Sequence, residues 1–311
     1  MAYTVNSGTA VSKDLENYKK AVTLEEIDIR IPEEMDFSGA VITQNTDKLD
    51  IYFQMPKESV LPVFKIDEGQ TVIRQKMGWF ETGVSLYGYR GAIEISDVAK
   101  VRGDYGMQWR SSIDGVTNGF VEARDSEIIH ALYNGAGNTV TATEEWSDVS
   151  GKDIITDVGA AVRKIFHNKR SNIRTSELNN LKIYYPAKLI MDIDVPEQFQ
   201  NGTSGAMGYL IPNESQTSFL RGRNIEFIPT SRLNEETFAI GVMPSVKCAV
   251  QYVYNGTAMP RVEEYRDIEE GAEGYMMSQW FRTKITPQSS AQRTTSDRVF
   301  LINGVATADE T

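Results

Sequence analysis

Residues 104–134 read DYGMQWRSSIDGVTNGFVEARDSEIIHALYN and contain the clearest periodic pattern in the chain. The apolar positions recur every three or four residues: Trp109, Ile113, Val116, Phe120, Ile128, Ala131 and Leu132. This spacing predicts one amphipathic helix of about 30 residues, roughly 45 Å long at 1.5 Å per residue. Such a helix is longer than a compact small domain is thick.

Glycines divide this predicted helix and end it. Gly115 and Gly119 each weaken a helix by about 1 kcal/mol relative to alanine, so we expect close packing or a bend there. Gly135 and Gly137 follow Asn134 and predict the helix stop, because glycine is the usual residue after a helix end. They do not form a nucleotide-binding glycine loop, which precedes a helix.

Strand patterns precede the helix. Residues 70–80 alternate between two faces and residues 89–96 form a second extended run, so Gln70–Ser96 is predicted to be a long β-hairpin. Both faces carry apolar residues, so we expect one face to lie on another molecule; folding back onto its own domain is the alternative. Aromatic residues and methionine are enriched in interface cores, which makes five residues candidate contacts: Met77, Trp79, Phe80, Leu86 and Tyr87.

The first 50 residues have weak periodicity and read as an N-terminal arm with isolated apolar anchors. We expect the arm to cross to a neighbouring subunit through four of them: Leu15, Tyr18, Val22 and Leu24.

The rest of the chain is divided by pattern. Asp153–Phe166 is a second amphipathic helix, and strand-like runs follow near residues 181–185, 188–191, 224–228 and 238–243. Residues 151–244 are therefore predicted to form a compact α/β unit. From residue 245 the chain is mostly extended, up to a last strand at residues 298–302.

Composition restricts the function. The 311 residues carry 43 acids and 32 bases, a net charge of −11, which disfavours tight binding to nucleic acid. There is no apolar run of the roughly 20 residues that span a bilayer and no targeting pattern, so we expect synthesis in a cytosol and no membrane partner.

Catalytic and metal-binding patterns are weak. One cysteine and two distant histidines make a zinc site improbable. His130 reads as a polar contact, His167 as a helix-end residue and Cys248 as a core residue. Asp192 and Asp194 alternate on one strand, where a solvated face is the simpler interpretation, and cation binding or a hydrolase or sugar-binding site are the alternatives. We expect no catalytic, cofactor or metal site and no enzyme activity.

The order of these pieces resembles the major capsid proteins of tailed phages and related archaeal viruses, which share the Hong Kong 97-type fold. The resemblance covers nearly the whole chain as layout and carries no diagnostic motif. It implies an α+β fold with an N-terminal arm (1–50), an extended loop with flanking strands (51–103), a peripheral domain with a long spine helix (104–150 and 245–311) and an axial domain (151–244). Encapsulin nanocompartments are similar in layout.

The resemblance also implies a function. It implies a self-assembling subunit of hexamers and pentamers in an icosahedral shell around double-stranded DNA, assembled in host cytoplasm and located in the virion. Copies of the chain would be its main partners, with scaffold, portal and decoration proteins as separate ones and only weak, non-specific contact with the packaged DNA. An encapsulin-like compartment is the alternative.

Overall fold

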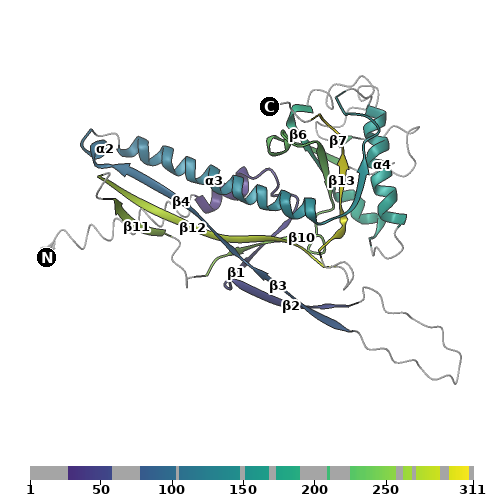
Figure 1. Cartoon of the computed structure of the whole chain (residues 1–311), viewed down its shortest axis with the longest axis horizontal. Helices are drawn as coiled ribbons and strands as arrows, with labels where there is room; N and C mark the ends of the chain where they lie inside the picture. The colour runs from purple at the N-terminus through teal and green to yellow at the C-terminus, as the bar shows by residue number, and fades with distance from the viewer. Residues whose placement is uncertain are drawn as a thin grey trace, which may run out of the picture.

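The structure is a computed structural model that describes residues 27–57, 78–102, 105–147, 151–167, 173–189, 209–210, 225–256, 262–267, 271–287 and 294–307. Figure 1 shows an elongated molecule in which a long helix lies along a twisted sheet. A compact unit closes one end, and a two-stranded hairpin projects from the sheet. Helices and strands are both prominent, so the α+β class is confirmed.

The long helix, α3 (Tyr105–Asn134), spans 30 residues, as the apolar spacing predicts. It follows the short helix α2 (Asp97–Arg102). Its buried stripe comprises Ile113, Phe120, Val121, Ile128 and Leu132. The predicted stop is also confirmed: the chain turns at Gly135 into β5 (Ala136–Thr141), and a Cβ there would collide with the Ile285 side chain.

A five-stranded sheet lies against α3. Its main path runs β1 (Ile42–Thr46), β10 (Ala249–Tyr254), β12 (Ala272–Ile285) and β11 (Val262–Asp267), and β4 (Tyr87–Ser96) pairs with β12. Tyr89 of β4 stacks on Phe281 of β12 with ring centroids 4.2 Å apart. Trp109 of α3 meets Tyr275 edge-on at 5.2 Å. The first pair joins two neighbouring strands, and the second helps fix the helix along the sheet.

The predicted hairpin Gln70–Ser96 is wrong in its pairing. β3 (Trp79–Ser85) pairs with β2 (Asp50–Pro56), whereas β4 pairs with β12 over ten residues. Ile93 and Ile95 of β4 are buried in this arrangement, and burial of apolar side chains favours it. Alternation identifies a strand, but it does not identify the partner of that strand.

The predicted arm is also corrected over its second half. Residues 27–34 are helical, and Ile27, Ile31 and Phe37 are buried in the main core. β1 then joins the sheet in parallel with β10. The apolar residues here are few but converge on α3 and the sheet, so this segment orders within its own chain. The anchors Leu15, Tyr18, Val22 and Leu24 lie outside the described residues.

The compact unit is a six-stranded sheet. Its order is β5, β13 (Ser296–Asn303), β9 (Phe238–Val242), β6 (Leu181–Pro186), β8 (Ile225–Thr230) and β7 (Tyr209–Leu210). Helix α4 (Gly151–His167) packs on one face, and the other face packs on the end of α3. Short 3-10 turns lie at η1 (Thr175–Asn180), η2 (Ala187–Leu189) and η3 (Ser231–Leu233).

Two predictions for this unit differ from the structure. β5 and β13 belong to its sheet, although their sequence positions suggested the domain of the long helix. β5 forms one edge of this sheet, and β13 lies between β5 and β9, where Phe300 and Ile302 are completely buried. Residues 188–189, predicted as strand, lie in η2.

Candidate interaction surface

The β2–β3 hairpin has one covered and one uncovered face. The register pairs Ile51 with Val84 and Pro56 with Trp79. Directly opposite residues in an antiparallel pair share a face. Val84 points inward and is 5% exposed, whereas Tyr52 and Trp79 are 67% and 55% exposed on the outer face.

The inner face packs on the five-stranded sheet, on the side away from α3. Val84, Leu86 and Tyr254 form a small buried cluster, with Tyr252 and Trp280 against it. Tyr254 and Trp280 meet edge-on with ring centroids 5.7 Å apart. This cluster is separate from the two larger cores, so few apolar contacts hold the hairpin to the rest of the chain.

Lys284 of β12 fastens the hairpin to the sheet. Its Nζ donates to Thr82 Oγ1 at 2.9 Å and to the carbonyl of Gly83, and it lies 5.9 Å from the Phe53 ring centroid. Burial, and secondarily the charge of Arg282, lowers the pKa of Lys284. The Lys284 ammonium is therefore partly desolvated where it forms hydrogen bonds to β3.

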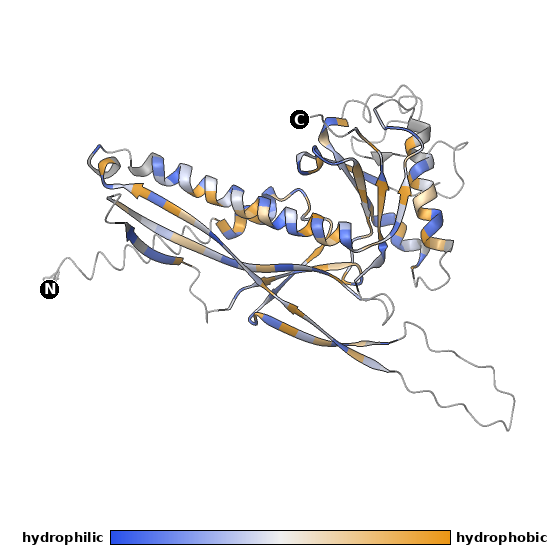
Figure 2. Ribbon diagram, viewed as in Figure 1, coloured by the Kyte–Doolittle hydropathy of each residue, from blue (hydrophilic) through white to orange (hydrophobic). Residues whose placement is uncertain are grey.

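The outer face and edges of the hairpin have no covering among the described residues. β2 and β3 pair with each other and with no further strand in the part of the chain that the structure describes. Figure 2 shows hydrophobic and hydrophilic residues mixed along both strands. A two-stranded ribbon with open edges and exposed aromatic rings is marginal on its own and is typical of an interaction surface.

The predicted contact residues separate into three groups. Trp79 and Tyr87 are exposed, the latter at 51% with the Arg282 guanidinium 4.1 Å from its ring centroid. Phe80 and Leu86 are 9% and 8% exposed, so the chain itself buries them and they are poor contacts for a partner. Met77 lies outside the described residues.

Tyr52 is an exposed aromatic residue of this hairpin that the sequence prediction missed. Its ring lies close to Gly83 of the opposite strand, where a Cβ would be 3.0 Å from it. The alternating pattern of residues 50–56 indicates which of their side chains share a face. The predicted hairpin Gln70–Ser96 did not include this strand as the partner of residues 79–85.

A groove of about 470 Å³ lies between α3 and β4. Gly115 and Gly119 are among the residues lining it, and a Cβ built on either would meet nothing within 4 Å. The close packing predicted for these glycines is therefore not found within the described chain, where α3 continues through both.

His130 and Cys248 are the histidine and the cysteine whose side chains the structure describes, and the surroundings of both can be identified. His130 contacts Asn134 at 3.1 Å near the end of α3. Cys248 is buried, which raises the pKa of its thiol to about 12 and confirms the core prediction. Among the described residues no cluster of three His, Cys, Asp or Glu side chains is placed to hold a metal ion. Asp192, Asp194 and the His167 side chain lie outside what the structure describes.

No helix in the described part of the chain combines the length and apolar character that crossing a bilayer needs. The sequence matches no protein-family model and no curated protein.

Comparison with solved structures finds shell proteins. A virus-like particle protein from Pyrococcus furiosus aligns over 90% of this chain and 98% of its own, with a TM-score of 0.53 and 9% identity. The capsid of Myoviridae phage XM1 aligns over 86% and 90%, with a TM-score of 0.56 and 9% identity.

An encapsulin is similar to the same degree. The SrpI encapsulin of Synechococcus elongatus PCC 7942 aligns over 85% of both chains, with a TM-score of 0.53 and 11% identity. The chain has the Hong Kong 97-type capsid fold.

Proposed function

We propose that this chain is the structural subunit of a closed protein shell, and that its role is structural rather than catalytic. The observation that carries the proposal is the β2–β3 hairpin, whose outer face exposes Tyr52 and Trp79 and whose edges are unpaired among the described residues. A contact of a hairpin with a different part of the next copy is head-to-tail, and such contacts close into rings when the rotation allows it.

A viral capsid is the favoured form of this shell. In it, hexamers and pentamers of the chain enclose double-stranded DNA in the virion of a tailed phage or a related archaeal virus, with assembly in the host cytoplasm. The net charge of −11 supports weak, non-specific contact with that DNA. Scaffold, portal and decoration proteins would be separate partners.

An encapsulin-like compartment is the second candidate, favoured by the comparable similarity to the SrpI encapsulin. Particles isolated from the native source separate the two: nuclease-resistant double-stranded DNA indicates a capsid, and an enclosed folded protein without a genome indicates a compartment.

The shell proposal is tested by assembly of purified protein. The wild type should form large particles on gel filtration and in negative-stain images, and Tyr52→Ser with Trp79→Ser should remain folded and stay small. Val246→Ser is the control, because Val246 is a 62% exposed apolar residue that does not belong to the hairpin. A wild-type chain that stays monomeric, or double-variant particles that match the wild type, would contradict the role of the hairpin.

A further inference from the structure

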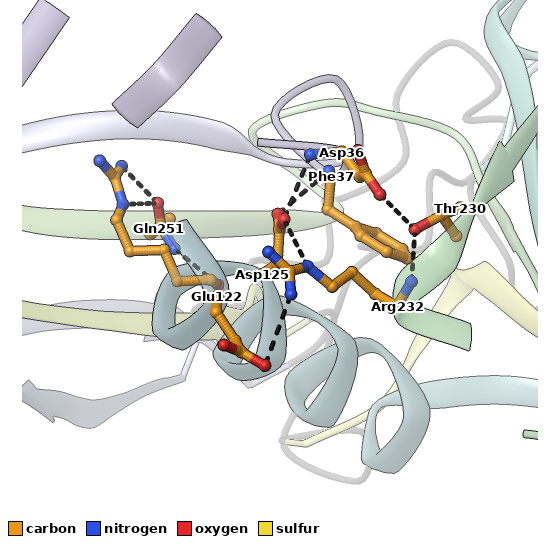
Figure 3. A network of polar contacts seen from close by, with 8 residues as sticks. Asp36, Phe37, Glu122, Asp125, Thr230, Arg232 and Gln251 are labelled. Carbon is orange, nitrogen blue, oxygen red and sulfur yellow. Dashed lines mark hydrogen bonds and ion pairs between the residues drawn. The ribbon is translucent and has the colours of Figure 1, made fainter. Parts of the chain in front are cut away.

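One fully buried carboxylate joins three parts of the molecule. Asp125 of α3 is 0% exposed. It accepts the backbone N–H of Phe37 on Oδ1 at 3.1 Å and that of Asp36 on Oδ2 at 3.2 Å. Arg232 of η3, in the compact unit, places its Nε 3.8 Å from the same Oδ2 (Figure 3).

The surrounding contacts join the same three parts. Thr230 Oγ1 donates to Asp36 Oδ2 at 2.6 Å and accepts the backbone N–H of Arg232 at 3.1 Å. Arg232 Nη1 also lies 3.4 Å from Glu122 of α3, a side chain that is 68% exposed. The Phe37 ring stacks on Tyr184 of β6 at 4.4 Å. Polar contacts to α3 thus fix the compact unit and residues 36–37 together.

We propose that Asp125 and Arg232 form a proton-sensitive latch that sets how firmly the compact unit is held against α3. With Asp125 ionised, its charge attracts Arg232 and both oxygens accept amides. With Asp125 protonated, the attraction to Arg232 is lost and the protonated oxygen becomes a poor acceptor for the Asp36 amide. The exposed contact to Glu122 then remains as the polar link from Arg232 to the helix, and exposed ion pairs contribute little.

The burial favours a proton at this position. An isolated carboxylate without a close cation is costly to bury, and Arg232 is beyond hydrogen-bond distance. The charged and titratable groups around Asp125 come from several elements. They are Asp36 from the turn before β1, Arg232 from η3, Tyr184 from β6, and Glu122 and Arg124 from α3 itself. Burial raises the pKa of Asp125 to about 6, although the amides of Phe37 and Asp36 oppose the rise.

Loosening of the latch is distinct from acid unfolding. Because the folded-state pKa is raised above its ordinary value of 3.8, the folded chain takes up this proton before the unfolded chain does. On this account the stability of the fold increases as the pH falls from about 6 towards 4. The contact between compact unit and helix weakens over the same range because the loosened form loses Arg232 but keeps Asp125 buried beneath residues 36–37. A loosened form that hydrated Asp125 would bind the proton less tightly, and acid would then close it. We therefore expect a fall in pH over this range to increase the motion between the compact unit and α3 and to make global unfolding less favourable.

The distance between the bodies tests the latch directly. Spin labels at Arg110→Cys on α3 and Arg163→Cys on α4 report that distance in the full chain, diluted with unlabelled chains; both positions are exposed, and Cys248 is buried. The wild-type distance distribution should broaden as the pH falls from 7.5 to 5. Asp125→Asn should be broad at both values, and Glu122→Gln should keep the wild-type response.

If Asp125→Asn does not fold, infrared spectroscopy of the wild type and of Arg232→Gln tests the proposal instead. A protonated-carboxyl band should appear in the wild type with a midpoint near pH 6, and Arg232→Gln should shift that midpoint upward because the cation is lost. Exchange of the Phe37 amide, corrected for its intrinsic pH dependence, should be roughly tenfold faster in Arg232→Gln at pH 7.5.

Histidine ordinarily changes charge in the same pH range, so His130→Gln with His167→Gln is the final control and should leave the response intact. An unchanged distance distribution in the wild type, a response abolished by the histidine variant, or a midpoint insensitive to Arg232→Gln would overturn the proposal. None of these outcomes depends on whether the chain assembles into a shell.

Discussion

The compact unit and the β2–β3 hairpin differ in how far other parts of the chain cover the faces of their strands. The six-stranded sheet is covered on one face by α4 and on the other by the end of α3, and residues such as Ile183 and Ile240 are completely buried. The hairpin has one covered face, a three-residue buried cluster and exposed aromatic rings. Among the described residues the first region covers both faces of its sheet, whereas the second leaves aromatic rings exposed.

Aromatic truncation should show the largest contrast between the two regions. Phe300→Ala removes a completely buried ring whose carbon atoms lie against Gly241, and we expect it to lower the free energy of unfolding by about 3–5 kcal/mol. Trp79→Ala, at an exposed ring, should change it by less than about 0.5 kcal/mol. Denaturant unfolding measures both. Similar losses from the two variants would mean that the hairpin is as integrated as the compact unit.

A buried ion pair sharpens the comparison within the compact unit. Arg298, 3% exposed, donates to Glu177 through Nε at 2.6 Å and Nη2 at 3.1 Å. Glu177→Ala leaves the guanidinium buried without this partner, which should cost about 2–3 kcal/mol.

The pH dependence of that cost has a definite sign. Burial acts to raise the pKa of Glu177, but the hydrogen bonds from Arg298 and from the backbone N–H of Arg174, together with the charges of Arg298 and Lys247, more than offset it, so the folded-state pKa lies below the ordinary 4.5. The contribution is then present above pH 4.5 and is lost as the pH falls through the lowered value. Unfolding of the wild type and Glu177→Ala should converge in acid; a gap independent of pH would show that packing, not charge, is responsible.

Lys284→Met should loosen the hairpin with a smaller effect. It removes the hydrogen bonds to Thr82 and Gly83, which we expect to lower the local opening free energy of β2–β3 by about 1–2 kcal/mol. Amide exchange of residues 79–85 measures this opening against global unfolding. Lys48→Met, an exposed lysine near the same strands, is the control. Equal changes in the hairpin and in β6 would contradict a local role.

The smallest expected effect is a stabilisation. Gly115→Ala and Gly119→Ala, made one at a time, should each raise the free energy of unfolding by about 1 kcal/mol, because alanine favours a helix and its Cβ meets open space. Thermal unfolding measures the gain. Gly135→Ala is the contrasting control and should destabilise, since its Cβ would collide with Ile285. A lower free energy of unfolding in Gly115→Ala or Gly119→Ala would show that packing within the chain requires glycine at that position of α3.

The elements with strong local patterns were predictable from sequence. The 30-residue helix, its stop before Gly135, helix α4 and most strands of the compact unit follow from apolar spacing and glycine placement. The exposure of Trp79 also agrees with its choice as a contact residue. The contact function itself remains a prediction that assembly must test.

Partner choice was decided by the tertiary structure. A strand pattern gives the direction of each side chain, but the energy that selects β12 rather than β3 as the partner of β4 comes from burying Ile93 and Ile95 under α3. The same applies to β5 and β13, which join a sheet whose other strands come from between residues 181 and 242, and to Asp125. Its burial depends on residues 36–37 and Arg232, about 90 and 107 positions away, meeting at one point on the helix. Sequence fixes local periodicity through short-range sterics, whereas long-range burial settles which surfaces meet.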